Sequence, residues 1–427
     1  MIDSLKVAER NLSWYEEGTN AIKPCVYKEY ISHLYNLEEI GIKEHPFIEE
    51  LCNAMSFTPF STEKALYAKE RIKYGAQKAR MEIDISDICN FKCPGCTFQF
   101  SQQDKQLSYE KLEGFIAELQ RKGVEAITLA GGGEPTIYNN SGMRLPDVTE
   151  KFKEAGIEIF LITNAFALSD EDIKRILTSV SGIRISIYNF IAPGEPENKN
   201  QIVYENIHKI LQIKKELNVS THVLIGTLIS WNSKKDFEFS IGLAKKFNTI
   251  VTPRPYISIQ RNAKEMLSLT EVHKILDRVL KNYLIIKSEI NPHQPIAMRE
   301  YLERVLAFTL PLEKRCTVTE LGLCGKLRAN GDLYRCGQLS AKSNIIEKRK
   351  DKNIFFSNIY EGAEAALEQH LQGKKGLTNY NMCPVCRESL NNIRLNRFDK
   401  VPKVIQSEIL DKVLPAYEHN KNLSKFW

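Results

Sequence analysis

The chain has 427 residues, of which 43% are hydrophobic and 26% are charged, and its formal net charge is +6. This length suffices for one large domain with one or two smaller ones, and the hydrophobic fraction suffices for a buried core. The weak positive charge falls in mixed-sign segments such as 347–352, so we expect a solvated surface and no nucleic-acid partner. No segment has the roughly 18 apolar residues of a membrane span, and the start lacks a signal-peptide core, which predicts a cytoplasmic protein without a membrane partner.

The first 80 residues are expected to form a helical extension. Prolines at positions 24, 46 and 59 separate short helical patterns, a helix is predicted from Ser61 towards Ala79, and strand-like alternation is scarce.

From residue 81 the pattern changes to alternating strands and helices. Strands are predicted at 81–86, 126–130, 158–163, 182–188, 220–230 and 250–257, and helices at 109–122, 145–154, 169–177, 203–216 and 234–247. Six β/α units in series predict an α/β fold with a parallel sheet buried by helices.

The C-terminal third has a different pattern. Two more helices are predicted at 267–288 and 298–310, and the region 316–340 is predicted to be antiparallel because Asn330-Gly331 is a typical hairpin turn. Further helices are expected at 363–373 and 403–417. These patterns divide the chain into a helical extension, a barrel-like domain, a small α+β domain and a C-terminal helix, with predicted bounds 1–80, 81–310, 311–395 and 396–427.

Ten cysteines in a reducing compartment are more typical of metal ligands than of disulfides. Cys25 and Cys52 stand alone, and we interpret both as small buried hydrophobic residues. The other eight fall into two groups, which indicates two metal centres.

The first group is Cys89, Cys93 and Cys96, spaced C-x3-C-x2-C directly after the first predicted strand. Three thiolates on one loop can bind three corners of a [4Fe–4S] cluster and leave one iron open to a ligand. Structural zinc is the alternative, but it needs a fourth ligand that only a distant segment could supply.

This loop, together with Gly131-Gly132-Gly133-Glu134-Pro135-Thr136 after the second strand, resembles the radical S-adenosylmethionine (SAM) superfamily. The resemblance implies a partial (β/α)6 TIM-like barrel. It also implies that the open iron chelates the amino and carboxylate groups of SAM, with Glu134 and its glycines at the amino group. Glycines would allow backbone carbonyls to approach that cation closely. Reductive cleavage of SAM would give a 5′-deoxyadenosyl radical that abstracts hydrogen from a substrate.

Weaker similarities to the family follow along the chain. Thr163-Asn164 ends the third strand, Ser186 lies in the fourth, and Ile225-Gly226 lies in the fifth. The resemblance implies that Asn164 and Ser186 contact polar groups of SAM and that Gly226 lines the adenine. The alternative for each position is ordinary packing at a strand end.

One position departs from the family. Gly95 stands where an aromatic residue usually precedes the third cysteine, close to the adenine. Phe98 or Phe100 could cover the adenine instead. The departure affects the adenine contacts and leaves the cluster ligands unchanged.

The second group of cysteines, with Gly331 and Cys336 spaced G-x4-C on the predicted hairpin, resembles a twitch/SPASM extension. That resemblance implies an auxiliary [4Fe–4S] cluster, while a zinc ribbon is the alternative. The four ligands implied are Cys316, Cys336, Cys383 and Cys386, and Cys324 could replace one of them.

The resemblance implies an enzyme that oxidises or rearranges a small polar substrate, such as a sugar, an aminocyclitol or a nucleoside-like alcohol. The auxiliary cluster would accept an electron, and a flavodoxin or ferredoxin would supply one to the first cluster. The alternatives are a maturase of ribosomally made peptides and a non-enzymatic metal-binding module. The helical start favours a small substrate, because a leader-binding domain would contain strands. Candidate substrate contacts at the carboxyl ends of strands are Tyr188, Asn189, Arg254 and Tyr256.

Overall fold

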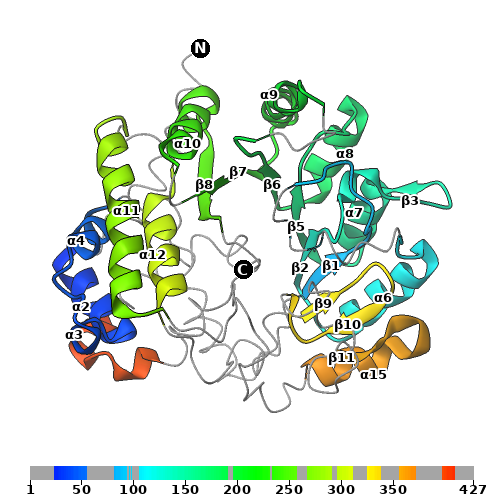
Figure 1. Cartoon of the computed structure of the whole chain (residues 1–427). Coiled ribbons are helices and arrows are strands. Elements are labelled where there is room, and N and C mark those ends of the chain that lie inside the picture. Colours follow the sequence, from blue (N-terminus) through cyan, green and yellow to red (C-terminus); the bar gives the residue numbers. More distant parts are fainter. Residues whose placement is uncertain are drawn as a thin grey trace.

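The computed structural model describes residues 24–54, 81–93, 96, 98, 105–190, 196–230, 233–256, 267–290, 296–310, 325–337, 355–371 and 397–408. Its centre is a sheet in which six parallel strands are neighbours in chain order. Figure 1 shows the sheet as a curved band with helices on its outer side, as in a partial barrel. These strands are β1 (Met81–Asp84), β2 (Ala126–Ala130), β5 (Glu158–Thr163), β6 (Gly182–Ser186), β7 (His222–Ile229) and β8 (Ile250–Pro255).

The two faces of this sheet differ in chemistry because side chains alternate along each strand. Residues such as Ile83, Leu129 and Leu161 join the apolar core that the outer helices cover. The alternate positions, which include Asp84 and Arg184, lie on the concave face. The covering helices are α6 (Tyr109–Arg121), α7 (Leu145–Glu154), α8 (Asp170–Ser179), α9 (Lys199–Leu217) and α10 (Lys234–Phe247).

A helical layer lies beyond β8, where α11 (Leu269–Lys287) and α12 (Met298–Thr309) contact the N-terminal extension. That extension contains α2 (Pro24–Tyr35), α3 (Leu37–Ile40) and α4 (Pro46–Asn53). Pro24 and Pro46 begin helices, where a missing N–H costs nothing. The buried Glu303 of α12 accepts hydrogen bonds from the hydroxyls of Tyr27 (2.9 Å) and Tyr35 (3.2 Å). The segment 397–408, with the 3-10 helix η4 (Phe398–Lys400), lies against α2 (Figure 1).

The C-terminal hairpin extends the central sheet. It consists of β9 (Gly325–Leu327) and β10 (Asp332–Tyr334), and β11 (Phe355–Asn358) pairs with β10. The turn places Gly331 at φ 86°, a conformation that favours glycine. Because β9 pairs in parallel with β1, the sheet has nine described strands in the order β11-β10-β9-β1-β2-β5-β6-β7-β8. Helix α15 (Ile359–Leu371) follows and packs on α6.

Most predicted elements are confirmed, several at their predicted ends. Helix α15 begins four residues before the predicted position, and β11 and the small hairpin of β3 (Asn139–Asn140) and β4 (Met143–Arg144) were not predicted. The helix predicted from Ser61 and the chain beyond residue 408 lie outside the described residues. The interpretation of Cys25 is wrong, because it is exposed in the first turn of α2, whereas Cys52 is buried as predicted.

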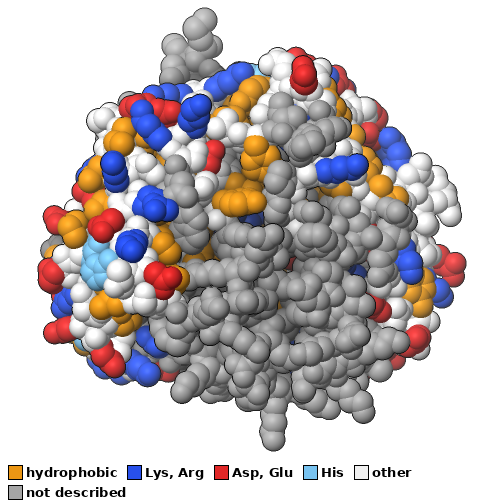
Figure 2. Space-filling view, viewed as in Figure 1, with side chains coloured by type: hydrophobic (Ala, Val, Ile, Leu, Met, Phe, Trp, Pro, Cys, Tyr) orange, Lys and Arg blue, Asp and Glu red, His pale blue; other side chains and the backbone are white. Residues whose placement is uncertain are grey.

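Two surface properties bear on partners. None of the helices that the structure describes is long and apolar enough to cross a membrane. On the face shown in Figure 2, basic and acidic side chains are interspersed over the described surface.

Candidate active site

The glycine-rich turn after β2 is held against the chain segment that enters the cysteine loop, residues 89–96. The backbone N–H of Gly133 donates to the carbonyl of Ser86 at 2.8 Å, and that of Glu134 donates to the carbonyl of Ile88 at 2.7 Å. A Cβ at Gly133 would lie 1.9 Å from the Ile88 carbonyl oxygen, and a Cβ at Gly131 would lie 1.5 Å from the carbonyl oxygen of Gly133. The absence of side chains therefore allows the turn to fold tightly and to contact the cysteine loop through backbone atoms.

Glu134 places a carboxylate at the junction of this turn with the end of β5. Its side chain is 3% exposed and accepts hydrogen bonds from the backbone N–H of Thr136 (3.0 Å) and of Asn164 (2.8 Å). The hydroxyls of Thr136 (2.8 Å) and Thr163 also donate to it. Burial raises the pKa of Glu134, and these donors oppose that shift because they stabilise the charged form. The donors fix the carboxylate in one position.

The cysteine loop is joined to the same strand end. The amide of Asn164 donates to the side-chain oxygen of Asn90 at 2.8 Å, and within the loop the backbone N–H of Phe91 donates to the Cys89 sulfur at 3.4 Å. Cys89, Cys93 and Cys96 are all partly buried. Burial raises the pKa of the Cys89 thiol to about 12, but a coordinated metal deprotonates such a thiol outright.

Three cysteine thiols are a donor set for an iron–sulfur cluster with one open iron, whereas structural zinc takes four ligands. Within the described parts of the chain, no three His, Cys, Asp or Glu side chains gather closely enough to hold one metal ion. The cysteines of a cubane cluster each bind a different iron, so their sulfurs need not converge on one point.

Ser186 ends β6, the strand beside β5, and Tyr188 follows two residues later. Their side chains share a hydrogen bond, and burial raises the pKa of Tyr188, with a further contribution from the Cys93 and Cys96 thiols. The carbonyl of Tyr188 accepts a hydrogen bond from the Asn200 amide at 3.2 Å. Tyr188 is therefore the candidate substrate contact that the structure places beside the cysteine loop.

Of the other three candidate substrate contacts, Asn189 follows the same strand as Tyr188, and Arg254 and Tyr256 lie two strands further along the sheet. Asn189 is exposed and donates to the Asp236 carboxylate at 3.3 Å. Arg254 is half-buried near the end of β8, and Tyr256 follows it, with its backbone N–H bonded to the Ile229 carbonyl at 2.9 Å. These three follow or end strands β6 and β8, which are separated from the glycine-rich turn after β2 by at least one other strand of the sheet.

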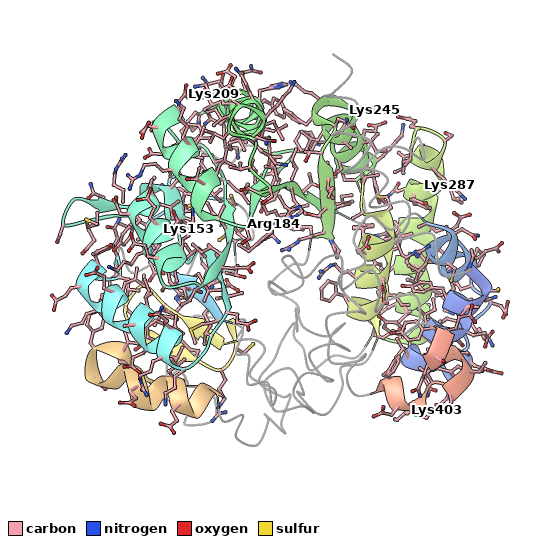
Figure 3. The ribbon with its side chains drawn as sticks, turned by 180° about the vertical axis from the view of Figure 1, so that it is seen from behind. Lys153, Arg184, Lys209, Lys245, Lys287 and Lys403 are labelled. Atoms are coloured by element: carbon pink, nitrogen blue, oxygen red, sulfur yellow. The ribbon has the colours of Figure 1, made fainter. Side chains whose placement is uncertain are left out.

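Arg184 is a concave-face residue that was not identified from the sequence. It is buried on β6, and a Cβ at Gly226 of β7 would lie 3.3 Å from its Cδ and Nε atoms. Gly226 pairs with Ser186, two residues after Arg184, so Arg184 lies one layer below both of them. Figure 3 shows Arg184 on the inner side of the curved sheet. The sequence signal that could have identified it is an arginine between two isoleucines in an otherwise apolar strand, which places it on the opposite face of the sheet from them.

Comparison with known proteins decides the family. Residues 83–228 match the model of the Radical SAM superfamily. This chain contains a radical SAM domain. The superfamily to which this domain is matched uses a [4Fe–4S] cluster together with SAM.

Two relatives are similar to this chain over most of their own length. The GTP 3′,8-cyclase of Mannheimia succiniciproducens is 22% identical over 325 residues, which cover 70% of this chain and 90% of the relative. The probable GTP 3′,8-cyclase of Saccharolobus solfataricus is 22% identical over 284 residues, which cover 64% of this chain and 87% of the relative. A solved structure of histidine-tagged anSMEcpe with bound AdoMet has a TM-score of 0.48 at 14% identity, over 80% of this chain and 99% of that chain.

Phe98 contacts the C-terminal hairpin, and Cys336 follows the second strand of that hairpin. Phe98 is buried, and its ring centre lies 4.5 Å from the Lys326 ammonium nitrogen and 5.0 Å from the Arg328 guanidinium carbon. Cys336 is buried just after β10. The other predicted ligands of an auxiliary cluster lie outside the described residues, and so do Gly95 and Phe100; these ligands are Cys316, Cys324, Cys383 and Cys386.

Proposed function

We propose that this radical SAM enzyme generates a 5′-deoxyadenosyl radical and abstracts hydrogen from a small polar substrate such as a sugar, an aminocyclitol or a nucleotide. The observation that carries the proposal is the position of Glu134. A buried carboxylate, fixed by four donors, lies at the point where the glycine-rich turn, the cysteine loop and the end of β5 meet. A cationic amino group is the natural partner of such a carboxylate.

In this proposal Cys89, Cys93 and Cys96 hold the first cluster. When bound, that cluster supplies the electron that breaks a carbon–sulfur bond of SAM. The chain's own residues bind and orient SAM: Glu134 accepts from its amino group, and Asn164 and Ser186 offer polar groups on the neighbouring strand ends. Gly226 is proposed to line the adenine, and its missing side chain lets Arg184 pack closely on the β7 backbone, since a Cβ there would lie 3.3 Å from Arg184.

Three observations support a small substrate. The relatives named above are GTP 3′,8-cyclases, and the name gives them a nucleotide as substrate. The described part of the N-terminal extension, residues 24–54, is helical and contains no strand that could pair with a peptide leader. Arg254 and Tyr256 offer a cation and a hydroxyl near the carboxyl end of β8, where barrel enzymes bind substrates.

The hairpin is proposed to carry the auxiliary cluster, with Cys336 as a ligand and the remaining ligands among the other four cysteines of the second group. A cluster with four cysteine ligands has no open iron, so it would act as an electron acceptor. The net reaction would then be a two-electron oxidation of the substrate, with a flavodoxin or ferredoxin as donor to the first cluster.

The test begins with anaerobic reconstitution, an iron count and an assay for 5′-deoxyadenosine. We expect about eight irons per chain and deoxyadenosine formation, because two cubane clusters hold four irons each. Only about four irons would remove the auxiliary cluster from the proposal. Absence of deoxyadenosine from the reduced, fully loaded protein would refute radical chemistry, and deoxyadenosine formed only with a peptide would favour a maturase.

Glu134→Gln tests the residue that carries the proposal. It removes the negative charge and replaces one acceptor by a donor that faces N–H and O–H groups, so we expect the Kd for SAM to rise roughly 10- to 100-fold. Glu158→Gln is the matched control, since Glu158 begins β5, at the opposite end of the strand from Thr163, and accepts from Ser181 at 3.1 Å. Equal SAM affinities of the two variants would refute the role of Glu134.

A further inference from the structure

A buried network of charges lies between the C-terminal hairpin and the first strand of the barrel. It consists of Lys326 and Arg328, which belong to or follow β9, and of Glu82, Asp84 and Asp87, which belong to or follow β1. Lys326 and Asp84 are fully buried, while Arg328 and Asp87 are 4% and 1% exposed. The register explains the pairing, because Lys326 is directly opposite Glu82 in the parallel ladder. Charges this deeply buried are tolerated because they are paired.

The two cations differ in how far they reach. Lys326 pairs with Asp84 at 2.6 Å and with Glu82. Arg328, two residues further along, lies 3.4 Å from Asp84 and donates from Nη2 to Asp87 at 2.7 Å. Both cations lie against the ring of Phe98. Arg328 therefore reaches towards the cysteine loop, since Asp87 precedes Cys89 by two residues.

Arg328 also lies against the glycine-rich turn. A Cβ at Gly132 would be 2.9 Å from the Arg328 Nη2 atom and 2.0 Å from the Asp87 carboxylate oxygen to which Arg328 donates. The Arg328–Asp87 ion pair, which we call the floor, thus packs directly against Gly132. The next residue of the turn, Gly133, donates a backbone hydrogen bond to the Ser86 carbonyl. The floor, the turn and the start of the cysteine loop are one packed unit.

We propose that Arg328 is a positioning residue for SAM: it holds Asp87 beneath Gly132 and so makes the geometry of the SAM-binding turn depend on the C-terminal hairpin. This inference rests on the proposed function of that turn. The guanidinium is suited to the task because its planar fork can serve two carboxylates at once, which an ammonium group serves less specifically. Binding of SAM and correct docking of the hairpin are therefore coupled through one side chain.

The test compares Arg328→Met with Lys326→Met in the full-length, reconstituted protein. Both substitutions remove a buried cation that pairs with Asp84 and lies on Phe98, but only Arg328 reaches Asp87 and Gly132. We expect Arg328→Met to raise the Kd for SAM about 10-fold, within the usual range of such couplings, and Lys326→Met to change it less than about twofold. Arg328→Lys should recover part of the affinity. The affinity is measured by calorimetric titration and by the change in the EPR signal of the reduced cluster when SAM is added.

Stability is controlled by thermal unfolding of each variant, since both losses of a buried partner should lower Tm. If Arg328→Met does not fold, Asp87→Asn removes the same ion pair at constant shape and should raise the Kd similarly. Equal affinities of the Arg328 and Lys326 variants, or an unchanged affinity of Asp87→Asn, would overturn the inference. A wild-type protein that carries its cluster but does not bind SAM would instead refute the proposed function.

Discussion

Gly133→Ala is a sharp test of the contact between the glycine-rich turn and the cysteine loop. Its Cβ would lie 1.9 Å from the carbonyl oxygen of Ile88, and real Cβ contacts essentially never fall below 3.0 Å, so the two segments must separate by at least about 1.1 Å. Two backbone hydrogen bonds cross this contact, at 2.8 and 2.7 Å. Each contributes roughly 0.5–1.5 kcal/mol net, so the variant should lose about 1–3 kcal/mol of unfolding free energy.

The functional effect of Gly133→Ala should exceed the effect on stability. The same separation moves Glu134 relative to Cys89, and a misplacement of about 1 Å can lower a rate on the order of 100-fold. The assays are urea unfolding and deoxyadenosine formation by the reduced protein. Gly114→Ala is the matched control, because Gly114 is in helix α6 with no atom within 4 Å of an added Cβ. If Gly133→Ala unfolds and reacts like Gly114→Ala, the reasoning about this contact is refuted.

Three further predictions concern stability. Burial lowers the pKa of His222 in the folded chain to about 4. Between pH 6.5 and pH 4 the unfolded chain therefore binds a proton at this histidine and the folded chain does not. The free energy of unfolding consequently falls as the pH falls. His222→Gln should reduce the loss between pH 7 and pH 5 by roughly 2 kcal/mol in urea unfolding. Glu303→Ala removes the acceptor of two buried tyrosine hydroxyls and should cost roughly 2–4 kcal/mol; a cost near zero would show that the N-terminal helices dock by apolar packing alone. Arg175→Ala breaks half-exposed pairs with two carboxylates on α7 and should cost less than about 1 kcal/mol by the same measurement.

The parts of the fold that local sequence determines were predicted well. Strands β2 and β5 and helices α7 and α10 have their predicted ends, because apolar periodicity and helix caps act within a few residues. Ser169 shows the mechanism, since its side chain accepts from the backbone N–H of Asp172 at 3.1 Å and so begins α8 as predicted. The hairpin at Gly331 followed from turn chemistry in the same way.

What the sequence could not predict depends on residues far apart in the chain. The pairing of β9 with β1 joins Lys326 to Glu82 across 244 positions, and a three-residue strand with a charged centre carries no pattern that shows its partner. Thr163 ends β5 beside Asn164, and its hydroxyl donates a hydrogen bond to Glu134, a contact that only the packed structure reveals. Cys25 was misread for a simpler reason: cysteine is usually buried, but the first turn of α2 is at the surface.

The pairing of β9 with β1 also has a consequence for synthesis of the chain on the ribosome. Strand β1 emerges early, but the partner that covers its outer edge is more than 240 residues away. Until residues 325–327 are made, β1 is an exposed edge strand with Asp84 unneutralised, and open strand edges invite pairing with other chains. A nascent or truncated chain that ends before β9 is therefore expected to aggregate, because β9 is the strand that covers the open edge of β1.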